Sequence, residues 1–135
     1  MKKKLSLLSV LIWMIFIFIM SSFDASESSA QSNIIVNFIS NIFNINNIEF
    51  LSLIIRKLAH FTEYFILGIL TYNLIKNYRK KYYIAIIICI IYAISDEIHQ
   101  IFIPGRSCQI TDILIDSIGA ITAIYICKLK HLFDK

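Results

Sequence analysis

The sequence predicts an all-α membrane protein with four transmembrane helices and an amphipathic helix in the first outer loop. Three observations lead to this fold class. Hydrophobic residues make up 58% of the 135 positions, and the chain has only three glycines and one proline. The mean hydropathy is +0.72, which excludes an ordinary soluble domain. The apolar segments are also long enough to cross a hydrocarbon core about 30 Å thick. The length limits residues 1–135 to a single domain.

Four apolar segments have the length and composition of spanning helices: residues 5–22, 53–75, 82–102 and 112–127. The first follows three lysines and precedes a stretch of small residues, which is also a pattern of signal peptides, with Ala30 as the cleavage residue. Ala30 lies further beyond the apolar run than a cleavage site usually does. We therefore interpret this segment as the first transmembrane helix.

The distribution of cationic residues predicts the orientation. Ten of the 13 lysines and arginines lie at the N-terminus, in the loop before residue 82 or in the C-terminal tail. By the positive-inside rule these regions are cytoplasmic. We expect a multi-pass protein of the cell membrane with both termini in the cytoplasm. The net charge of +4 follows from these short clusters, so we do not expect nucleic acid as a partner.

Residues 34–43, between the first two apolar segments, have helical periodicity. Apolar residues recur along one face and asparagines and serines occupy the other. This pattern predicts an amphipathic helix in the outer membrane interface. A packing helix of the bundle would show the same pattern, and periodicity does not separate the two.

Polar residues lie in or beside the last three apolar segments. At about 1.5 Å per residue, the acidic residues and histidines of these segments fall roughly 17–24 Å from the cytoplasmic side, in one layer of the outer half. Charges at this depth are costly and usually mark a functional site. The set comprises Lys57, His60, Glu63, Asp96, Glu97, His99, Gln100, Arg106, Asp112 and Asp116.

Spacings of three and four residues place many of these side chains on common helix faces. Three residues fall outside the shared faces. Glu97 is displaced by one position and is expected at the rim, Arg56 is expected to extend towards lipid headgroups, and Trp13 is expected to face lipid. The shared faces are Lys57, His60 and Tyr64; Asp96, His99 and Gln100; and Asp112, Asp116 and Gly119, whose small size permits close helix packing.

This set of polar residues has an excess of potential negative charge. Its cations are Lys57 and Arg106, and its five carboxyl groups are those of Glu63, Asp96, Glu97, Asp112 and Asp116. Protonation of carboxyl groups, protonation of His60 and His99, or a bound cation must compensate it. A metal site is one hypothesis, although Lys57 and Arg106 would repel a metal. Its donors would come from His60 with Glu63, Asp96 with His99, and Asp112 with Asp116.

The same two cations suit the phosphate or carboxylate of an anionic amphiphile. In an enzyme, His60 or His99 would transfer protons, and Glu63, Asp96, Asp112 or Asp116 would orient the histidine. Lys57 and Arg106 would hold the anion, with Tyr64, Glu97 and Gln100 as further binding residues. No motif identifies a reaction, so enzyme status and cofactors stay open. The alternative is a non-catalytic protein in which Lys57 with Glu63, or Arg106 with Asp112, braces the bundle or couples it to a partner.

Three motifs together resemble the VanZ-like family of small membrane proteins. The serine-rich stretch after the first apolar segment is also similar to that family, so the resemblance covers nearly the whole chain and argues against cleavage of a signal peptide. The motifs are Lys57-x-x-His60-Phe61-x-Glu63-Tyr64, Asp96-Glu97-x-His99-Gln100-x-Phe102-x-Pro104-Gly105-Arg106 and Asp112-x-x-x-Asp116-x-x-Gly119.

The resemblance implies a setting in the cell envelope and does not imply a reaction. The family is named for a protein associated with low-level teicoplanin resistance in Gram-positive bacteria, although membership does not imply antibiotic resistance. Teicoplanin acts outside the cell on lipid-linked wall precursors. The expected ligands are therefore a membrane lipid, a lipid-linked wall precursor or an acylated glycopeptide, bound at an outward-facing site.

Overall fold

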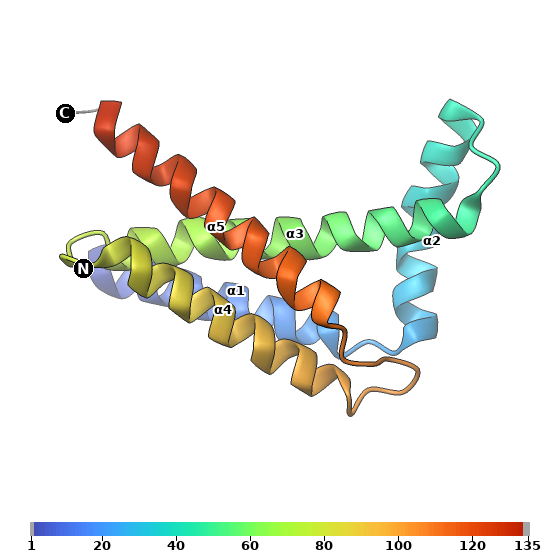
Figure 1. Cartoon of the computed structure of the whole chain (residues 1–135). Helices are drawn as coiled ribbons and strands as arrows, with labels where there is room; N and C mark the ends of the chain where they lie inside the picture. Colours follow the sequence, from blue (N-terminus) through green and yellow to red (C-terminus); the bar gives the residue numbers. More distant parts are fainter. Residues whose placement is uncertain (1, 134–135) are drawn as a thin grey trace.

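The structure, a computed structural model, describes residues 2–133 and contains only helices and connecting loops over that range (Figure 1). The predicted all-α class is therefore confirmed. The five helices are α1 (Lys2–Ser21), α2 (Ala25–Phe43), α3 (Ile48–Ile75), α4 (Lys81–Gln100) and α5 (Ile110–Phe133).

Three of these helices, α1, α4 and α5, are long and apolar enough to cross a membrane. Their qualifying stretches are Lys3–Ser21, Lys81–Gln100 and Ile110–Lys130. The 28-residue α3 is longer than any of them, but its ionisable residues lower its apolar character. The helices and their composition place the protein in a membrane.

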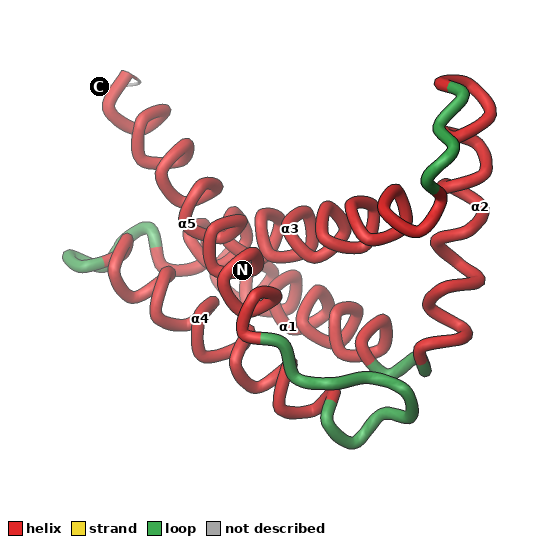
Figure 2. Tube along the Cα trace, turned by 45° about the vertical axis from the view of Figure 1, so that its right-hand side comes forward, coloured by secondary structure: helices red, strands yellow, loops and turns green. Residues whose placement is uncertain are grey.

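The helix α3 is the centre of the bundle, because it contacts each of the other four helices. α1, α3 and α4 run side by side, and α5 crosses α3 obliquely (Figures 1 and 2). The start of α1, the connection between α3 and α4, and the end of α5 lie at one end of the bundle. α2 and the loop between α4 and α5 lie at the other (Figure 1). We call the latter the α2 end.

The helix α2 begins earlier than the amphipathic pattern predicted. Asp24 caps its N-terminus by accepting hydrogen bonds from the backbone N–H groups of Ser26 and Glu27, both at 2.8 Å. The hydrogen bond from the Ser26 hydroxyl, with that from the Glu27 N–H, lowers the pKa of Asp24. The helix ends where Asn44 adopts a left-handed conformation with a φ of 51°. The amphipathic segment is thus the second half of a longer helix.

The apolar face of α2 is mostly turned away from the protein. Ile34, Phe38 and Phe43 are 76%, 67% and 70% exposed, whereas Val36 is fully buried. The helix lies across the α2 end of the bundle instead of running along it (Figures 1 and 2). This arrangement favours an interfacial helix over a buried packing helix, because these side chains have no protein surface to cover them.

Trp13 does not face lipid as predicted. Its indole N–H donates a hydrogen bond to the carbonyl oxygen of Glu63 at 2.8 Å, and its side chain packs partly buried against the core. The prediction was wrong because a polar indole N–H in an apolar setting gains from a protein acceptor. Trp13 therefore joins α1 to the polar part of α3.

Two glycines allow α3 and α5 to approach each other closely. A Cβ atom at Gly119 would lie 2.5 Å from the carbonyl oxygen of Phe61, and one at Gly68 would lie 2.8 Å from that of Ala120. These distances are too short for any side chain unless a backbone moves. The predicted role of Gly119 in close packing is confirmed, and the contact fixes the height of α5 against α3.

Candidate functional site

Three helices bring acidic and amide side chains together towards the α2 end. α4 contributes Asp96, Glu97 and Gln100, and α5 contributes Asp112 and Asp116; all five are buried. α3 faces them with His60 and further polar residues. Buried ionised groups are unfavourable unless a partner compensates them. Each of these groups therefore needs a partner.

Asp112 is paired with Lys57. The Lys57 ammonium donates to Asp112 Oδ1, with the two side chains 30% and 6% exposed. Neither ion pair weighed in the structural alternative, Lys57 with Glu63 or Arg106 with Asp112, is among the ion pairs of the described residues. Lys57 and Glu63 are six residues apart, which corresponds to a rotation of about 600° around the helix axis. Because this is not close to a whole number of turns, the two side chains lie on different faces of α3. The tight crossing of α3 and α5 supplies the partner instead.

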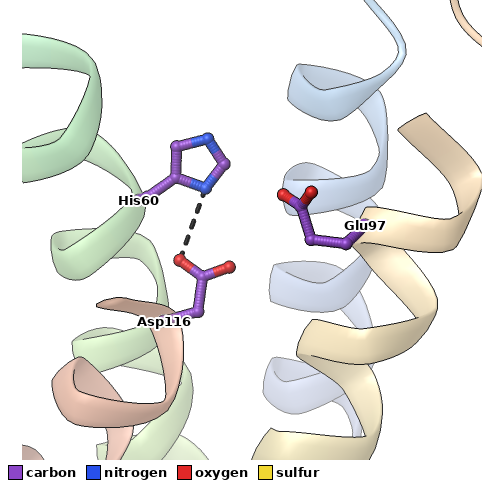
Figure 3. A group of neighbouring side chains, drawn as sticks. All are labelled: His60, Glu97 and Asp116. Atoms are coloured by element: carbon purple, nitrogen blue, oxygen red, sulfur yellow. Dashed lines mark ion pairs between the residues drawn. The ribbon is translucent and has the colours of Figure 1, made fainter. Parts of the chain in front are cut away.

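His60, Asp116 and Glu97 form a compact cluster, which we call the triad. Figure 3 shows His60 from α3 beside Asp116 from α5, with Glu97 from α4 facing them. His60 Nδ1 lies 3.3 Å from Asp116 Oδ1, and one donor atom from each of the three residues lies within 4.8 Å of the others. The triad therefore joins three helices.

Glu97 is not the rim residue that its helical position predicted, because its side chain is fully buried. One carboxylate oxygen, Oε2, accepts a hydrogen bond from the backbone N–H of Gln109 at 2.7 Å, just before α5 begins. The sequence misplaced Glu97 because helical spacing groups residues within α4 but does not say which face meets α5. The loop before α5 folds back onto Glu97 and covers it.

Several buried carboxylate oxygens of the described residues accept no hydrogen bond. They are Glu97 Oε1, Asp96 Oδ1 and both oxygens of Asp116. A buried acceptor that loses its water without gaining a partner costs about 1–3 kcal/mol, and more if charged. Such groups in a folded protein call for a proton, a water molecule or an ion as the partner. The triad holds three of these four oxygens.

His99 lies apart from the triad, against α1. Its Nε2 is 3.1 Å from the Ser22 hydroxyl, and its ring stacks on Phe18 at 4.3 Å. Asp96 also turns to α1, because the Ser21 hydroxyl donates to its Oδ2 at 2.9 Å. The pairing of Asp96 with His99 as metal donors is thus replaced by contacts of both residues with α1.

The loop residue Arg106 shares a cavity of about 170 Å³ with Arg56. Burial, together with the nearby Arg56 guanidinium, lowers the pKa of Arg106. The Nε atom of Arg106 is buried and has no hydrogen-bond partner. Apart from the two arginines, the cavity is lined by Met20, Ser21, Ser28, Ser32, Ile35, Ala59, His60 and Glu63.

The cationic pair at this cavity differs from the predicted one. Arg56, expected only to reach headgroups, takes the place beside Arg106 that was predicted for Lys57. Lys57 lines another cavity, of about 70 Å³, with Asp112 and His60, and Arg56 lines this cavity too. A one-residue step along α3 turns the side chain by about 100°. This rotation directs Lys57 to Asp112, whereas Arg56 reaches the cavity of Arg106.

The remaining predicted binding residues divide between cavity and core. Gln100 lines a cavity of about 90 Å³ together with Arg106 and Arg56. Tyr64 is fully buried in the apolar core cluster, 6.2 Å from the ring of Tyr92. Its hydroxyl group is buried there without a hydrogen-bond partner.

Sequence reasoning missed three serines at the site. Ser28 and Ser32 line the arginine cavity, and Ser21 binds Asp96. The serine-rich stretch was the signal in the sequence that could have pointed to them. The four-residue spacing of Ser28 and Ser32 indicates a common helix face. What the sequence lacked was the position of α2 across the end of the bundle.

The fold and this site define a class: a small helical membrane protein with a buried histidine–carboxylate cluster beside an arginine-lined cavity. The chain belongs to the VanZ/LLP1 family, whose model matches residues 6–131, nearly its whole length. The family predicted from the three motifs is confirmed. No curated protein and no solved structure shows significant similarity to the chain.

Proposed function

We propose that the α2 end of this protein faces outward and binds the headgroup of an anionic amphiphile. Candidate ligands are a membrane lipid, a lipid-linked cell-wall precursor or an acylated glycopeptide such as teicoplanin. The observation that carries the proposal is the convergence of Arg56 and Arg106 on one cavity, where the Nε atom of Arg106 is buried without a partner.

The guanidinium groups of Arg56 and Arg106 repel each other at one cavity, and partial burial removes part of the hydration of Arg106, whereas Arg56 is exposed. A phosphate or carboxylate placed between them would relieve both costs, since Arg binds such anions with two parallel hydrogen bonds. The Ser28 hydroxyl lines the same cavity and offers a further donor, whereas the Ser32 hydroxyl donates to the Ser28 carbonyl oxygen at 3.0 Å. With two guanidinium groups against the single carboxyl group of Glu63, the cavity favours an anion over a cationic or neutral ligand.

The cavity walls and α2 also suit the apolar part of an amphiphile. Met20, Ile35 and Ala59 contribute apolar wall, and the exposed apolar face of α2 lies at the same end of the bundle. With α2 in the membrane interface, a headgroup could enter the cavity while its acyl chains stay in the outer leaflet. The cavity is sized for a headgroup and not for a whole lipid.

If the protein modifies its ligand, His60 is the better placed of the two histidines for proton transfer. It lines the arginine cavity and contacts Asp116, which can orient the ring. His99 is held against α1 by Ser22 and Phe18. Glu63, which lines the same cavity, is the second acid–base candidate.

The outward orientation rests on a four-span topology in which α3 is the second transmembrane helix. Its 28 residues extend about 42 Å, enough to cross the hydrocarbon core. The start of α1 and the end of α5 lie at the same end of the bundle (Figure 1). That end carries most of the lysines, which supports a cytoplasmic location for it by the positive-inside rule.

A cysteine-labelling experiment tests this orientation. Cys108 is exposed in the loop at the α2 end, whereas Cys89 is buried. A membrane-impermeant maleimide added to intact cells should label the wild type and should not label Cys108→Ser. In the Cys108→Ser background, Asn77→Cys should become labelled only after permeabilisation. Labelling of Asn77→Cys in intact cells would reverse the orientation and remove the outward-facing site.

A structural network is the second candidate, and three contacts favour it for part of the site. Lys57 with Asp112, Ser21 with Asp96, and Glu97 with the Gln109 backbone each join two segments of the chain. These contacts hold the bundle together whether or not a ligand binds. They do not account for Arg56 and Arg106, whose positions bring like charges together.

Lipid binding by purified protein tests the proposed function. Native mass spectrometry would count phosphatidylglycerol and phosphatidylcholine molecules retained by the wild type and by Arg56→Gln/Arg106→Gln. Loss of charge-assisted hydrogen bonds worth about 1.5–3 kcal/mol each should weaken phosphatidylglycerol binding at least roughly tenfold. Thermal stability should stay unchanged or rise, because the repulsion is removed.

The matched control is Lys76→Gln/Lys130→Gln, which removes two cations that line a cavity at the opposite end of the bundle. It has the same net charge as the arginine double variant, so a general charge effect would weaken lipid binding equally in both. Equal loss in the two variants, or retention of phosphatidylglycerol by the arginine variant, would reject the anion site. A lower melting temperature in the arginine variant alone would support the structural network.

A further inference from the structure

We propose that His60, Glu97 and Asp116 bind one divalent transition-metal ion where α3, α4 and α5 meet. The site is independent of the proposed lipid ligand, because its donors are protein atoms alone. Each residue offers one donor atom, and the three atoms lie within 4.8 Å of one another. Figure 3 shows the three side chains directed towards a common point from three helices.

The distances fit a metal site that needs only small side-chain movements. Bonds of about 2.0–2.1 Å in a tetrahedral zinc site place the donor atoms about 3.4 Å apart. His60 Nδ1 and Asp116 Oδ1 already stand 3.3 Å apart. Glu97 must approach them by up to about 1.4 Å from the 4.8 Å limit, which rotation of its flexible side chain can supply.

The unpartnered atoms of the triad are the ones that a metal would use. Apart from the ion-pair contact of 3.3 Å between His60 Nδ1 and Asp116 Oδ1, neither these two atoms nor Asp116 Oδ2 and Glu97 Oε1 have a hydrogen-bond partner. Both carboxylate side chains are fully buried. The other Glu97 oxygen is held by the Gln109 N–H at 2.7 Å. Such a backbone contact fixes the orientation of a metal ligand and leaves its second oxygen free to bind.

The charges around the triad also favour a cation. The expected repulsion from Lys57 is weakened by its ion pair with Asp112. That from Arg106 and Arg56, at the cavity that His60 also lines, is partly offset by the Glu63 carboxyl group on the same cavity. Two carboxylates and a neutral imidazole would then carry a charge of −2 in an apolar setting. A divalent ion would neutralise this charge without requiring protonation of either carboxylate.

The donor set indicates which ions to test. One imidazole nitrogen with carboxylate oxygens suits zinc or manganese, whereas magnesium and calcium prefer oxygen ligands alone. Three protein ligands also leave a coordination position for water, as catalytic zinc sites do. His60 lines the arginine cavity, so that position would lie close to the proposed headgroup.

The test is metal binding by protein purified without a histidine tag and stripped with a chelator. After exposure to Zn²⁺ or Mn²⁺ and removal of free ions, elemental analysis should find about one ion per wild-type chain for at least one of the two metals. Glu97→Gln and Asp116→Asn should lower the retained metal at least roughly tenfold, because each isosteric amide replaces an anionic ligand by a neutral one. Mg²⁺ and Ca²⁺ should not be retained.

Asp96→Asn is the matched control. Asp96 adjoins Glu97 on α4, is buried and also has an unpartnered oxygen, but it lies outside the triad. This variant should retain metal like the wild type. Loss of metal from Asp96→Asn equal to that from Glu97→Gln would show that the triad is not the binding site.

Melting temperatures keep the test interpretable if a variant folds poorly. At roughly 100 times the dissociation constant, bound metal should raise the wild-type melting temperature by about 10 °C. Glu97→Gln should melt near the metal-free wild type and show no rise with metal. Substoichiometric metal on the wild type, or the same rise in every variant, would overturn the proposal.

Discussion

Replacement of Gly119 by alanine should destabilise the protein by about 2–3 kcal/mol, although alanine is the better helix former. In an exposed helix this exchange stabilises by about 1 kcal/mol. At Gly119, however, the new methyl group would lie 2.5 Å from the Phe61 carbonyl oxygen. The α3 backbone cannot rotate away as a side chain can, so the two helices must separate. Overpacking of this kind typically costs about 1–3 kcal/mol.

Thermal or denaturant unfolding in detergent measures this effect. Thr62→Leu is the control, because Thr62 neighbours Phe61 on α3 but is exposed. The larger leucine side chain enters no contact between helices, so the stability of this variant should stay close to that of the wild type. A Gly119→Ala variant more stable than the wild type would show that the two helices do not cross as closely as described.

Replacement of Lys57 by methionine should cost about 3 kcal/mol, because it leaves the Asp112 carboxylate buried without its partner. Asp112→Leu should cost less. Lys57 is 30% exposed, and its long side chain can turn its ammonium group towards water. The predicted asymmetry between the two single variants distinguishes a buried ion pair from a surface one, whose partners would each contribute under about 1 kcal/mol.

The double variant Lys57→Met/Asp112→Leu supplies the control. Replacing both charges by apolar groups leaves no unpaired ion, so its free energy of unfolding should be closer to that of the wild type than that of Lys57→Met is. Unfolding in mixed micelles would complete the double-mutant cycle. Additive losses in the double variant would contradict a direct interaction between Lys57 and Asp112.

Local patterns in the sequence predicted the helices and the depth of the polar layer. Apolar length predicted α1, α4 and α5, because a helix that crosses lipid must be apolar over about 20 residues. Helical periodicity predicted residues 34–43, although the Asp24 cap extends that helix back to Ala25. A depth count along each helix needs no knowledge of neighbours, so the shared layer of His60 and Asp116 followed from numbering alone.

The sequence could not assign partners within that layer. Several carboxylates lie at similar depths, and the choice among them depends on how the helices rotate about their axes. The glycine contact between α3 and α5 sets one such rotation, bringing Asp112 to Lys57 and Asp116 to His60. The hydrogen bond from the Gln109 N–H to Glu97 joins residues that are twelve positions apart. Helical periodicity does not predict this contact, because a loop separates the two residues.

The sequence by itself determined the all-helical class and the family, and it predicted which polar residues lie at membrane depth. These properties follow from hydropathy and spacing, which act along one helix at a time. The tertiary structure decided that Glu97 and not His99 joins His60, and that Arg56 and not Lys57 accompanies Arg106. Such choices depend on differences of about 100° around a helix axis, and only packing between helices fixes that angle.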